Sequence, residues 1–290
     1  MLTNFGSLLV LFPGANFSEL HEEKFKQKGA GWFPETTHLL VQNEIPLQST
    51  TYALHNAKGA TVIINPSPLP SPVEIRDFPW NLVDWLLVNE EEARELYKSV
   101  SEWRNESSSL DAATLTIRQL VLNLSAEPAF ERTNIVCTLG PEGVLAFVPT
   151  FHRPKAGNEV PSFIQLSAAK LQGNVRDTTG AGDCFTGYFV KGLMEFGPGA
   201  VVGTDIKEDD IVRILKTCVQ VSLSFLSFAD LKVSRKVYLE LLSFPYRLPE
   251  CVLRKEARLT VYPRGRRWRS DCYRLVNERH TYLLLLFFLT

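Results

Sequence analysis

The sequence lacks several features that would assign it to a protein class at once. Its five cysteines are an odd number without C-x-x-C spacing, which favours reduced thiols in a cytoplasmic protein over a disulfide framework. Five scattered histidines give no metal-binding pattern, and a formal net charge of -1 gives no general attraction to nucleic acid or acidic membranes. The loop G-x-x-x-x-G-K-S/T is also missing, which excludes the P-loop nucleotide hydrolases. The expected location is the cytoplasm, with the nucleus as an alternative.

The sequence also has little that indicates a membrane protein. Met1–Pro13 contains an apolar run but neither a basic leader nor a small-residue cleavage site, so we expect a buried strand there rather than a signal peptide. The nearly all-apolar stretch Thr281–Thr290 is shorter than the roughly 20 residues that a membrane helix needs. We therefore expect neither a membrane nor a nucleic-acid partner.

Between Leu8 and about Val221, short apolar runs alternate with amphipathic helical stretches. This alternation is typical of a mostly parallel sheet covered by helices. The expected strands are Ser7–Phe12, His38–Gln42, Thr61–Asn65, Trp85–Asn89, Asn134–Leu139 and Val144–Val148. The expected helices are Gln48–Ala57, Glu90–Tyr97, Ala112–Leu122, Ala181–Glu195 and Glu208–Val221. The expected loops are Pro66–Pro72, Ser99–Ser109 and Phe151–Pro161. Polar or Gly-rich residues follow several strands, where open α/β sheets bind ligands.

One segment, Asp177-Thr178-Thr179-Gly180-Ala181-Gly182-Asp183, directly precedes a helical pattern. Its small residues let backbone N–H groups converge at the helix start, where the helix dipole favours negative charge. Asp183 on the first turn is then placed to accept a proton from an attacking hydroxyl, as phosphoryl transfer requires. Taken alone, Asp183 also fits a plain acid at a helix N-terminus beside a tight loop.

The longer string D-T-T-G-A-G-D-x-F-x-G resembles the second signature of the PfkB carbohydrate kinase family. Shorter strings in the same order resemble elements of the ribokinases in that family: P-G-A-N at Pro13–Asn16, L-x-Q-x-E-x-P at Leu40–Pro46, N-P-x-P at Asn65–Pro68, N-x-x-E at Asn89–Glu92 and T-L-G-x-x-G at Thr138–Gly143. The resemblance covers Leu8–Val221. It implies a ribokinase-like three-layer α/β/α sandwich with a mostly parallel central sheet.

The same resemblance implies an ATP-dependent kinase acting on the primary hydroxyl of a pentose, most simply converting D-ribose to D-ribose 5-phosphate. Asp183 would be the base and, with Glu44, would contact the sugar, while Gly180, Ala181 and Gly182 would form the anion hole. The remaining implied ligands are Asn89, Thr138 and Gly140 for ATP, Glu92 for Mg²⁺, and Asp177 and Thr179 for a monovalent cation, K⁺.

Two departures from the ribokinase pattern qualify these expectations. Only Met1–Phe12 precedes P-G-A-N, where ribokinases carry their first strands, the G-G-x-x-x-N sugar-binding region and a β lid. We therefore expect a sheet without those strands and lid, an open sheet edge, and doubt over the homodimer that ribokinases form through the lid. Two alternatives stay open: an impaired protein with at most nucleotide binding, and a PfkB kinase for another sugar or nucleoside.

The second departure begins after about Val221. We expect residues 1–221 to form a partial kinase domain and residues 222–290 to be an atypical tail outside the native fold. Arg254–Arg279 holds eight arginines without a recognisable nucleic-acid-binding pattern. Our hypothesis is that Val221–Glu250 is a translated intron and that the remainder is read out of frame; transcript sequencing across codons 215–260 tests it.

Overall fold

The computed structural model describes residues 36–103, 112–154, 160–169 and 180–227, together with Glu23, Phe33 and five short strands beyond residue 250. The expected strand Ser7–Phe12 and the P-G-A-N element lie outside these residues. The structure therefore tests the sequence predictions mainly between residues 36 and 227.

Four adjacent parallel strands form the centre of the sheet: β1 (Thr36–Gln42), β2 (Thr61–Asn65), β3 (Trp85–Asn89) and β4 (Asn134–Thr138). Two antiparallel strands, β5 (Val144–Phe147) and β6 (Ile164–Leu166), continue it on the β4 side. The expected strands agree with β1 to β5 within a residue or two, whereas β6 was not expected. Its three residues are too short to show an alternation.

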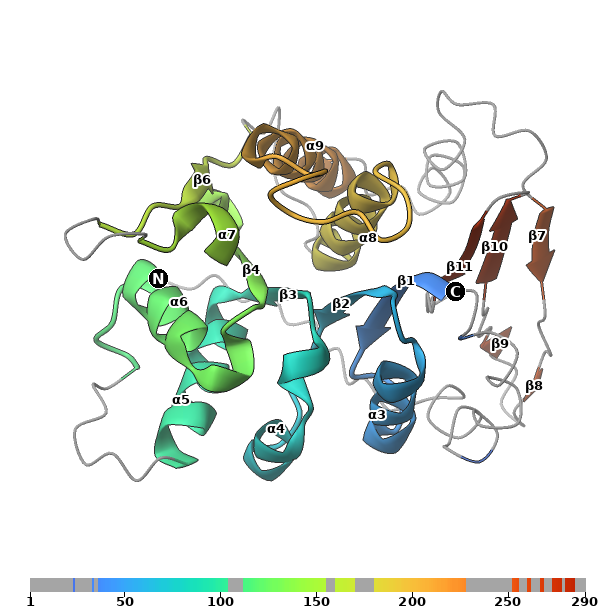
Figure 1. The fold of residues 1–290 in the computed structure, drawn as a ribbon, viewed down its shortest axis with the longest axis horizontal. Coiled ribbons are helices and arrows are strands. Elements are labelled where there is room, and N and C mark those ends of the chain that lie inside the picture. Colours follow the sequence, from blue (N-terminus) through green and yellow to red (C-terminus); the bar gives the residue numbers. More distant parts are fainter. Residues whose placement is uncertain are drawn as a thin grey trace.

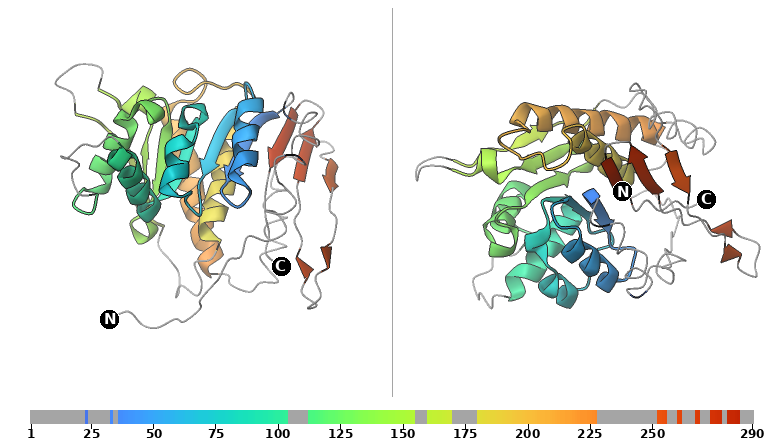
Figure 2. Two further views of the ribbon diagram at one scale, coloured as in Figure 1. Left: turned by 90° about the horizontal axis from the view of Figure 1, so that it is seen from below. Right: turned by 45° about the vertical axis from the view of Figure 1, so that its right-hand side comes forward.

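Helices cover both faces of this sheet (Figure 1). One face carries α3 (Leu47–Asn56), α4 (Pro72–Asp77), α5 (Glu90–Trp103) and α6 (Ile117–Ala126). The other carries α8 (Ala181–Met194) and α9 (Glu208–Ser227), and Figure 2 shows the same three layers from two further directions. The short α7 (Pro149–His152) follows β5. The three-layer α/β/α arrangement expected from the sequence is confirmed.

The period-two alternation of strand residues divides the core into two clusters. Leu39 and Val41 of β1 point into the cluster beneath α3 to α6, whereas Leu40 between them points into the cluster beneath α8 and α9. On the α8 side, Trp85 of β3 meets Phe189 of α8 with ring centroids 5.0 Å apart. Burial on both faces explains why these strands read as continuous apolar runs.

Helix boundaries differ from expectation where capping residues decide them. The expected helix Ala112–Leu122 begins only at Ile117, because Thr116 caps it in a reciprocal box with Gln119. The expected loop Pro66–Pro72 ends in α4, whose start is fixed by a capping box between Ser71 and Glu74. Helix α5 also continues into the expected loop Ser99–Ser109 as far as Trp103, and α7 takes Phe151 and His152 from the third expected loop.

Strands beyond residue 250 extend the sheet on the β1 side. β11 (His280–Leu284) pairs parallel with β1, and β10 (Tyr273–Asn277) and β7 (Val252–Lys255) continue antiparallel. An open sheet edge was expected from the sequence, whereas the edge of β1 away from β2 is paired with β11. A separate two-stranded ribbon joins β8 (Thr260–Val261) and β9 (Arg267–Trp268). The expected domain boundary at residue 221 falls inside α9, and the division of the chain into domain and tail stays a prediction.

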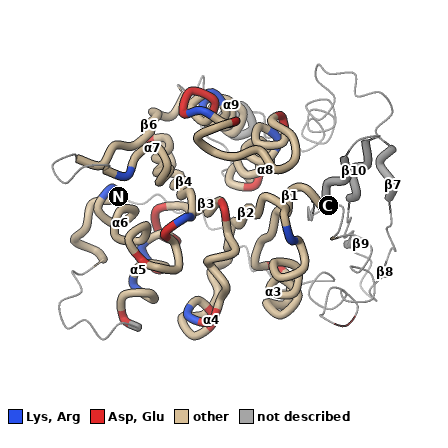
Figure 3. Tube along the Cα trace, viewed as in Figure 1, with Lys and Arg blue, Asp and Glu red and all other residues tan. Residues whose placement is uncertain are grey.

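Two further features concern the distribution of charged and apolar residues over the described helices. Figure 3 shows basic and acidic residues interspersed over the described helices, with no large region of one sign. Among the described residues, no helix combines the length and the apolar character needed to cross a bilayer.

Candidate active site

Polar residues end the four parallel strands, and the sheet register brings these ends together. Gln42 of β1 stands opposite Asn65 of β2, and Asn89 of β3 stands opposite Thr138 of β4. Because the strands are parallel, all four carboxyl ends lie at the same edge of the sheet. The sequence placed polar residues at these strand ends, and the register now shows which of them stand side by side.

Hydrogen bonds to neighbouring strands hold two of these side chains. The Asn65 side-chain amide donates to the carbonyl oxygen of Leu87 at 3.0 Å, and the Thr138 hydroxyl lies 3.5 Å from the carbonyl oxygen of Val88. Both contacts cross from one strand to the next. The polar groups at the strand ends are therefore positioned by the sheet itself.

Asn89 and Glu92 form a reciprocal cap at the start of α5. The Glu92 amide donates to Asn89 Oδ1 at 2.9 Å, and the Asn89 amide donates to Glu92 Oε2 at 2.9 Å. This pairing satisfies two backbone donors at the helix start. It also leaves Glu92 Oε1 without a hydrogen-bond partner among the described residues, so one carboxylate oxygen stays available for a ligand.

The opposite side of the site is the N-terminus of α8. Gly180 precedes the helix with φ of 78°, a left-handed conformation that favours glycine. The Cys184 amide donates to the carbonyl oxygen of Gly180 at 2.9 Å. The amides of Ala181, Gly182 and Asp183 thus come before the helix's own hydrogen-bond ladder, at the positive end of its dipole.

Gly182 has no structural reason to be glycine within the described part of the chain. Its φ is not among the positive values, and a Cβ atom there would meet nothing within 4 Å. Gly182 is one of the residues that line the pocket between α8 and the strand ends. Close approach of a ligand to the backbone explains a glycine at this position.

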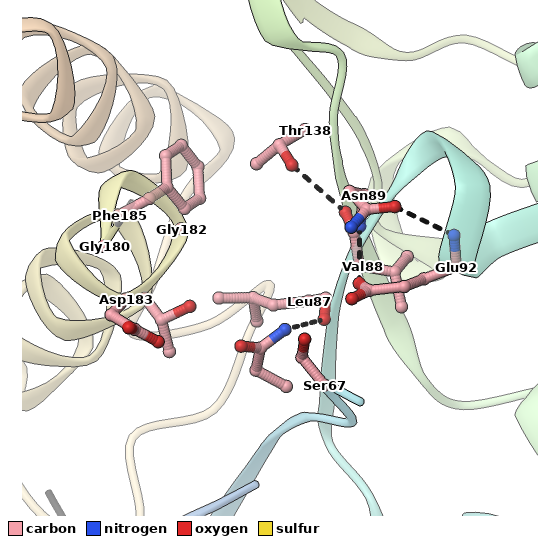
Figure 4. A pocket seen from close by; sticks show the side chains of 12 residues that line it. Ser67, Leu87, Val88, Asn89, Glu92, Thr138, Gly180, Gly182, Asp183 and Phe185 are labelled. Atoms are coloured by element: carbon pink, nitrogen blue, oxygen red, sulfur yellow. Dashed lines mark hydrogen bonds between the residues drawn. The ribbon is translucent and has the colours of Figure 1, made fainter. Parts of the chain in front are cut away.

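A pocket of about 210 Å³ lies between these two sides (Figure 4). We call its residues on the sheet, on the loop after β2 and on α5 the strand wall: Asn65, Ser67, Leu87, Val88, Asn89, Glu92 and Thr138. We call its residues on α8 the helix wall: Gly180, Gly182, Asp183, Phe185 and Thr186. In Figure 4, Asp183 stands across the cavity from Asn89 and Glu92. The lining contains two carboxylates and no lysine or arginine among the described residues, so the N-terminus of α8 is what favours an anion there.

Asp183 is exposed and makes one side-chain hydrogen bond among the described residues. Gln42 Nε2 donates to Asp183 Oδ1 at 3.1 Å, across 141 positions of sequence. Glu44, two residues after Gln42, is also exposed, yet partial burial of its carboxyl group and the nearby charge of Asp183 raise the pKa of Glu44. The end of β1 therefore delivers both a neutral donor and an acid to the surroundings of Asp183.

Six of the predicted site residues line the pocket: Asn89, Glu92, Thr138, Gly180, Gly182 and Asp183. Ala181, Glu44 and Gly140 are not among the lining residues. Gly140 lies two residues beyond Thr138, in a turn closed by a 2.8 Å bond from the Leu139 amide to the carbonyl oxygen of Gly143. Asp177 and Thr179, the predicted K⁺ ligands, lie outside the described residues, so those roles stay predictions.

Sequence reasoning did not assign Asn65, Ser67 or Gln42 to the site. Asn65 and Gln42 carried a usable signal, because each ends a parallel strand at the edge where ligands bind. The apolar lining residues Leu87, Val88 and Phe185 carried no such signal, since their spacing is that of ordinary core residues. Thr186 is buried on α8 and was also missed.

The donor set fits a magnesium ion shared with phosphate groups. Mg²⁺ is usually held by one or two carboxylates together with substrate phosphates and water, and Glu92 offers one uncommitted oxygen at the pocket. In the part of the chain that the structure describes, no cluster of three or more histidine, cysteine or acidic residues forms a site held by protein alone.

A helix N-terminus that faces the carboxyl ends of parallel strands is an arrangement at which α/β proteins commonly bind phosphate groups. The model of the pfkB family carbohydrate kinases matches residues 11–208. The chain belongs to this family.

Similar proteins include ribokinases from several organisms. The ribokinase of Lactococcus lactis is 28% identical over 196 residues, which cover 64% of this chain and 50% of that protein. The ribokinase of Haemophilus influenzae is 31% identical over 189 residues, with coverages of 64% and 52%. A crystal structure of ribokinase from Cryptococcus neoformans in complex with ADP is 38% identical, covers 64% of this chain and 52% of that one, and has a TM-score of 0.47. The chain thus spans about half the length of the relatives it matches.

Proposed function

We propose that the chain is an ATP-dependent sugar kinase whose acceptor is a primary hydroxyl of a pentose, most simply D-ribose. The observation that carries the proposal is the position of Asp183. Its carboxylate sits on the first turn of α8, beside the amides at the positive end of the helix, and faces the polar strand wall across the pocket. Family membership and the similarity to ribokinases support the same reaction class.

The reaction assigns a separate task to each wall. Asp183 accepts the proton of the sugar hydroxyl while the oxygen of that hydroxyl forms a bond to the γ-phosphorus of ATP. The bond between that phosphorus and the bridging oxygen breaks, and ADP leaves with the electron pair. The amides of Gly180, Ala181 and Gly182 stabilise the charge on the transferred group, which is the main requirement of phosphoryl transfer.

The strand wall holds the nucleotide and its metal ion. Asn89 and Thr138 contact the phosphates, and Gly140 borders the nucleotide beyond them. Because the lining brings two carboxylates close to phosphate charge, a counter-charge is needed, and Mg²⁺ supplies it when bound at Glu92. Glu44 contacts the sugar from just beyond the end of β1, and Asp177 and Thr179 would hold K⁺.

Ribose-dependent release of ADP by the purified chain tests the proposal. The Asp183→Asn variant is the control, because it keeps the shape of the side chain and removes the base. We expect release above this control in the presence of ribose, ATP and Mg²⁺. Release equal to that of the variant would overturn the catalytic proposal for this chain.

A second candidate is nucleotide binding without transfer. It is favoured by one observation: Asn89, Glu92 and Thr138, assigned to the nucleotide and its metal ion, line the pocket, whereas Glu44, assigned to the sugar, does not. Thermal-shift titration separates the two functions, since a ligand that binds the folded state raises the melting temperature. Stabilisation by Mg-ATP alone indicates this second function, whereas a further shift on adding ribose indicates a working kinase site. Testing fructose and adenosine in parallel addresses other acceptors.

A further inference from the structure

The end of β1 reaches the proposed base, although it belongs to a different layer of the fold. Gln42 is the last residue of β1, and Asp183 lies on α8, which packs over the sheet. The Gln42 side chain crosses between them and donates to Asp183 Oδ1 at 3.1 Å. No other side-chain hydrogen bond reaches Asp183 from the described residues.

We infer that Gln42 is a positioning residue: by donating to Oδ1 it fixes the Asp183 carboxylate so that Oδ2 faces the acceptor hydroxyl. The inference rests on the proposed function for the role of Asp183. An exposed aspartate on a first helical turn otherwise has several rotamers, including those in which it accepts from its own helix's amides. A donor from the sheet selects one of these rotamers.

The chemistry of the donor suits this task. A lysine or arginine at the same place would pair with the carboxylate by charge and compete with the proton that Asp183 has to accept. A glutamate would repel it. A neutral amide N–H aligns one oxygen and leaves the net charge of the site unchanged.

The segment that carries Gln42 is itself anchored. The next residue, Asn43, donates from its side-chain amide to the carbonyl oxygen of Pro68 at 2.8 Å. The Ser67 amide in turn donates to the carbonyl oxygen of Asn65 at 2.8 Å. Through these bonds the β1 end is fixed to the loop after β2, which contributes Ser67 to the strand wall and follows Asn65, so Gln42 couples the two walls of the pocket.

Glu44 provides a readout that does not depend on activity. The charge of Asp183 contributes to raising the pKa of Glu44, after partial burial of the Glu44 carboxyl group itself. If Gln42 holds the Asp183 carboxylate in place, replacing Gln42 changes the distance between the two carboxylates. The Glu44 titration then moves, and it moves only while residue 183 carries a charge.

The test is a double-mutant cycle followed by ¹³C NMR titration of the Glu44 side-chain carboxyl. Gln42→Met keeps the length of the side chain and removes the donor, and the equally neutral Gln42→Leu is a second variant should the first fail to fold. Each is combined with Asp183→Asn, and Gln48→Met, an exposed position on α3, is the matched control.

We expect Gln42→Met to shift the Glu44 titration in the Asp183 background and to leave it unchanged in the Asp183→Asn background. No shift in the first background, or an equal shift in both, would overturn the inference. Where the chain is active, we also expect kcat to fall by about ten- to a hundredfold with an unchanged KM for ATP. A chain that transfers no phosphate but shows the coupling would refute the proposed function and leave the positional inference standing.

Discussion

The two walls of the pocket are built in different ways. The strand wall presents side chains whose polar atoms are already held, such as Asn65 by the carbonyl oxygen of Leu87 and Asn89 by Glu92. The helix wall presents backbone amides and one carboxylate, that of Asp183. A side-chain wall is sensitive to the loss of a functional group, whereas a backbone wall is sensitive to the addition of a Cβ atom. The variants below test this difference.

The largest effect on activity is expected at Asp183, which is the only acid among the described residues of the helix wall. Asp183→Asn should lower the rate of phosphoryl transfer by about 10²–10⁴-fold, the usual contribution of a general base. Stabilisation by Mg-ATP should persist, because the amides of Gly180 and Gly182 are unchanged. Rapid-quench measurement of sugar phosphate formation checks the transfer rate, and thermal-shift titration checks the stabilisation by Mg-ATP. A variant that transfers phosphate at the original rate would remove Asp183 from the mechanism.

On the strand wall, Glu92→Gln separates capping from metal binding. Glutamine can replace glutamate in a capping box, so the free energy of unfolding should hardly change. Loss of the charge should raise the Mg²⁺ concentration needed for half-maximal Mg-ATP binding by about tenfold, equivalent to about 1.4 kcal/mol. Asn89→Ala is the contrasting variant, since loss of the N-cap costs about 1 kcal/mol of stability. An unaltered Mg²⁺ dependence in Glu92→Gln would show that this residue only caps α5.

Three glycines of α8 provide a matched series for the helix wall. Gly182→Ala adds a Cβ at a residue that lines the pocket, and Gly187→Ala adds one at a residue that does not; neither Cβ would touch another described residue. We expect nucleotide affinity to fall about tenfold, or about 1.4 kcal/mol, in the first variant only. Both should keep or gain up to about 1 kcal/mol of stability, since alanine favours helix. Equal nucleotide affinities in the two variants would contradict the anion-hole assignment.

Gly192→Ala, the third variant of the series, tests the packing of α8 against α9. Its Cβ would lie 2.7 Å from Cγ1 of Ile214 on α9, so the two helices that support the helix wall would have to separate. We expect a loss of about 1–3 kcal/mol of stability from overpacking. Chemical denaturation measures it, and a variant as stable as Gly187→Ala would show that the α8–α9 contact adapts freely.

The smallest expected effect is a pH dependence of stability. It involves α9, the helix that packs against α8 and so supports the helix wall. The Val148 amide donates to Nδ1 of buried His152 at 2.8 Å, so the ring proton sits on Nε2, 3.3 Å from Glu208 Oε1 at the start of α9. Burial lowers the pKa of His152, and Glu208 opposes this only in part. The unfolded chain therefore binds a proton more readily than the folded chain.

It follows that the His152 contribution to stability is complete above about pH 7 and declines as the pH falls below the ordinary histidine pKa of about 6.5. Denaturation at a series of pH values, with the non-titrating His152→Gln variant as control, measures it. We expect the stability difference between the two proteins to shrink on acidification. A constant difference would show that His152 does not titrate differently in the two states.

The sequence predicted the parts of the fold that depend on local pattern. Buried parallel strands read as apolar runs, and Thr61–Asn65 and Trp85–Asn89 have the bounds that β2 and β3 have in the structure. The start of α8 after Gly180 was equally clear, because small residues directly before an apolar helical pattern indicate a tight helix start. Helix starts set by side-chain caps were read less well: the helix after Thr116 was placed five residues too early, and the helix after Ser71 was not expected.

Contacts between distant segments could not be read from the sequence. Gln42 and Asp183 are 141 positions apart, and only the packing of α8 over the sheet brings them together. The same holds for Asn65, whose position at a strand end is local but whose place beside Asn89 depends on the sheet order. The strands beyond residue 250 were also not expected, because their sequences show no alternation of apolar and polar residues that would have identified them.

The most direct test of the central claim is a crystal structure of the chain with ADP, Mg²⁺, aluminium fluoride and ribose. Aluminium fluoride stands in for the phosphoryl group during transfer, so its position shows whether both walls serve one reacting group. We predict that it lies at the N-terminus of α8, within hydrogen-bond distance of the Gly182 amide, with the ribose hydroxyl facing Asp183 Oδ2 and Mg²⁺ on the Glu92 side. Aluminium fluoride bound elsewhere, or nucleotide bound away from the strand ends, would contradict the account.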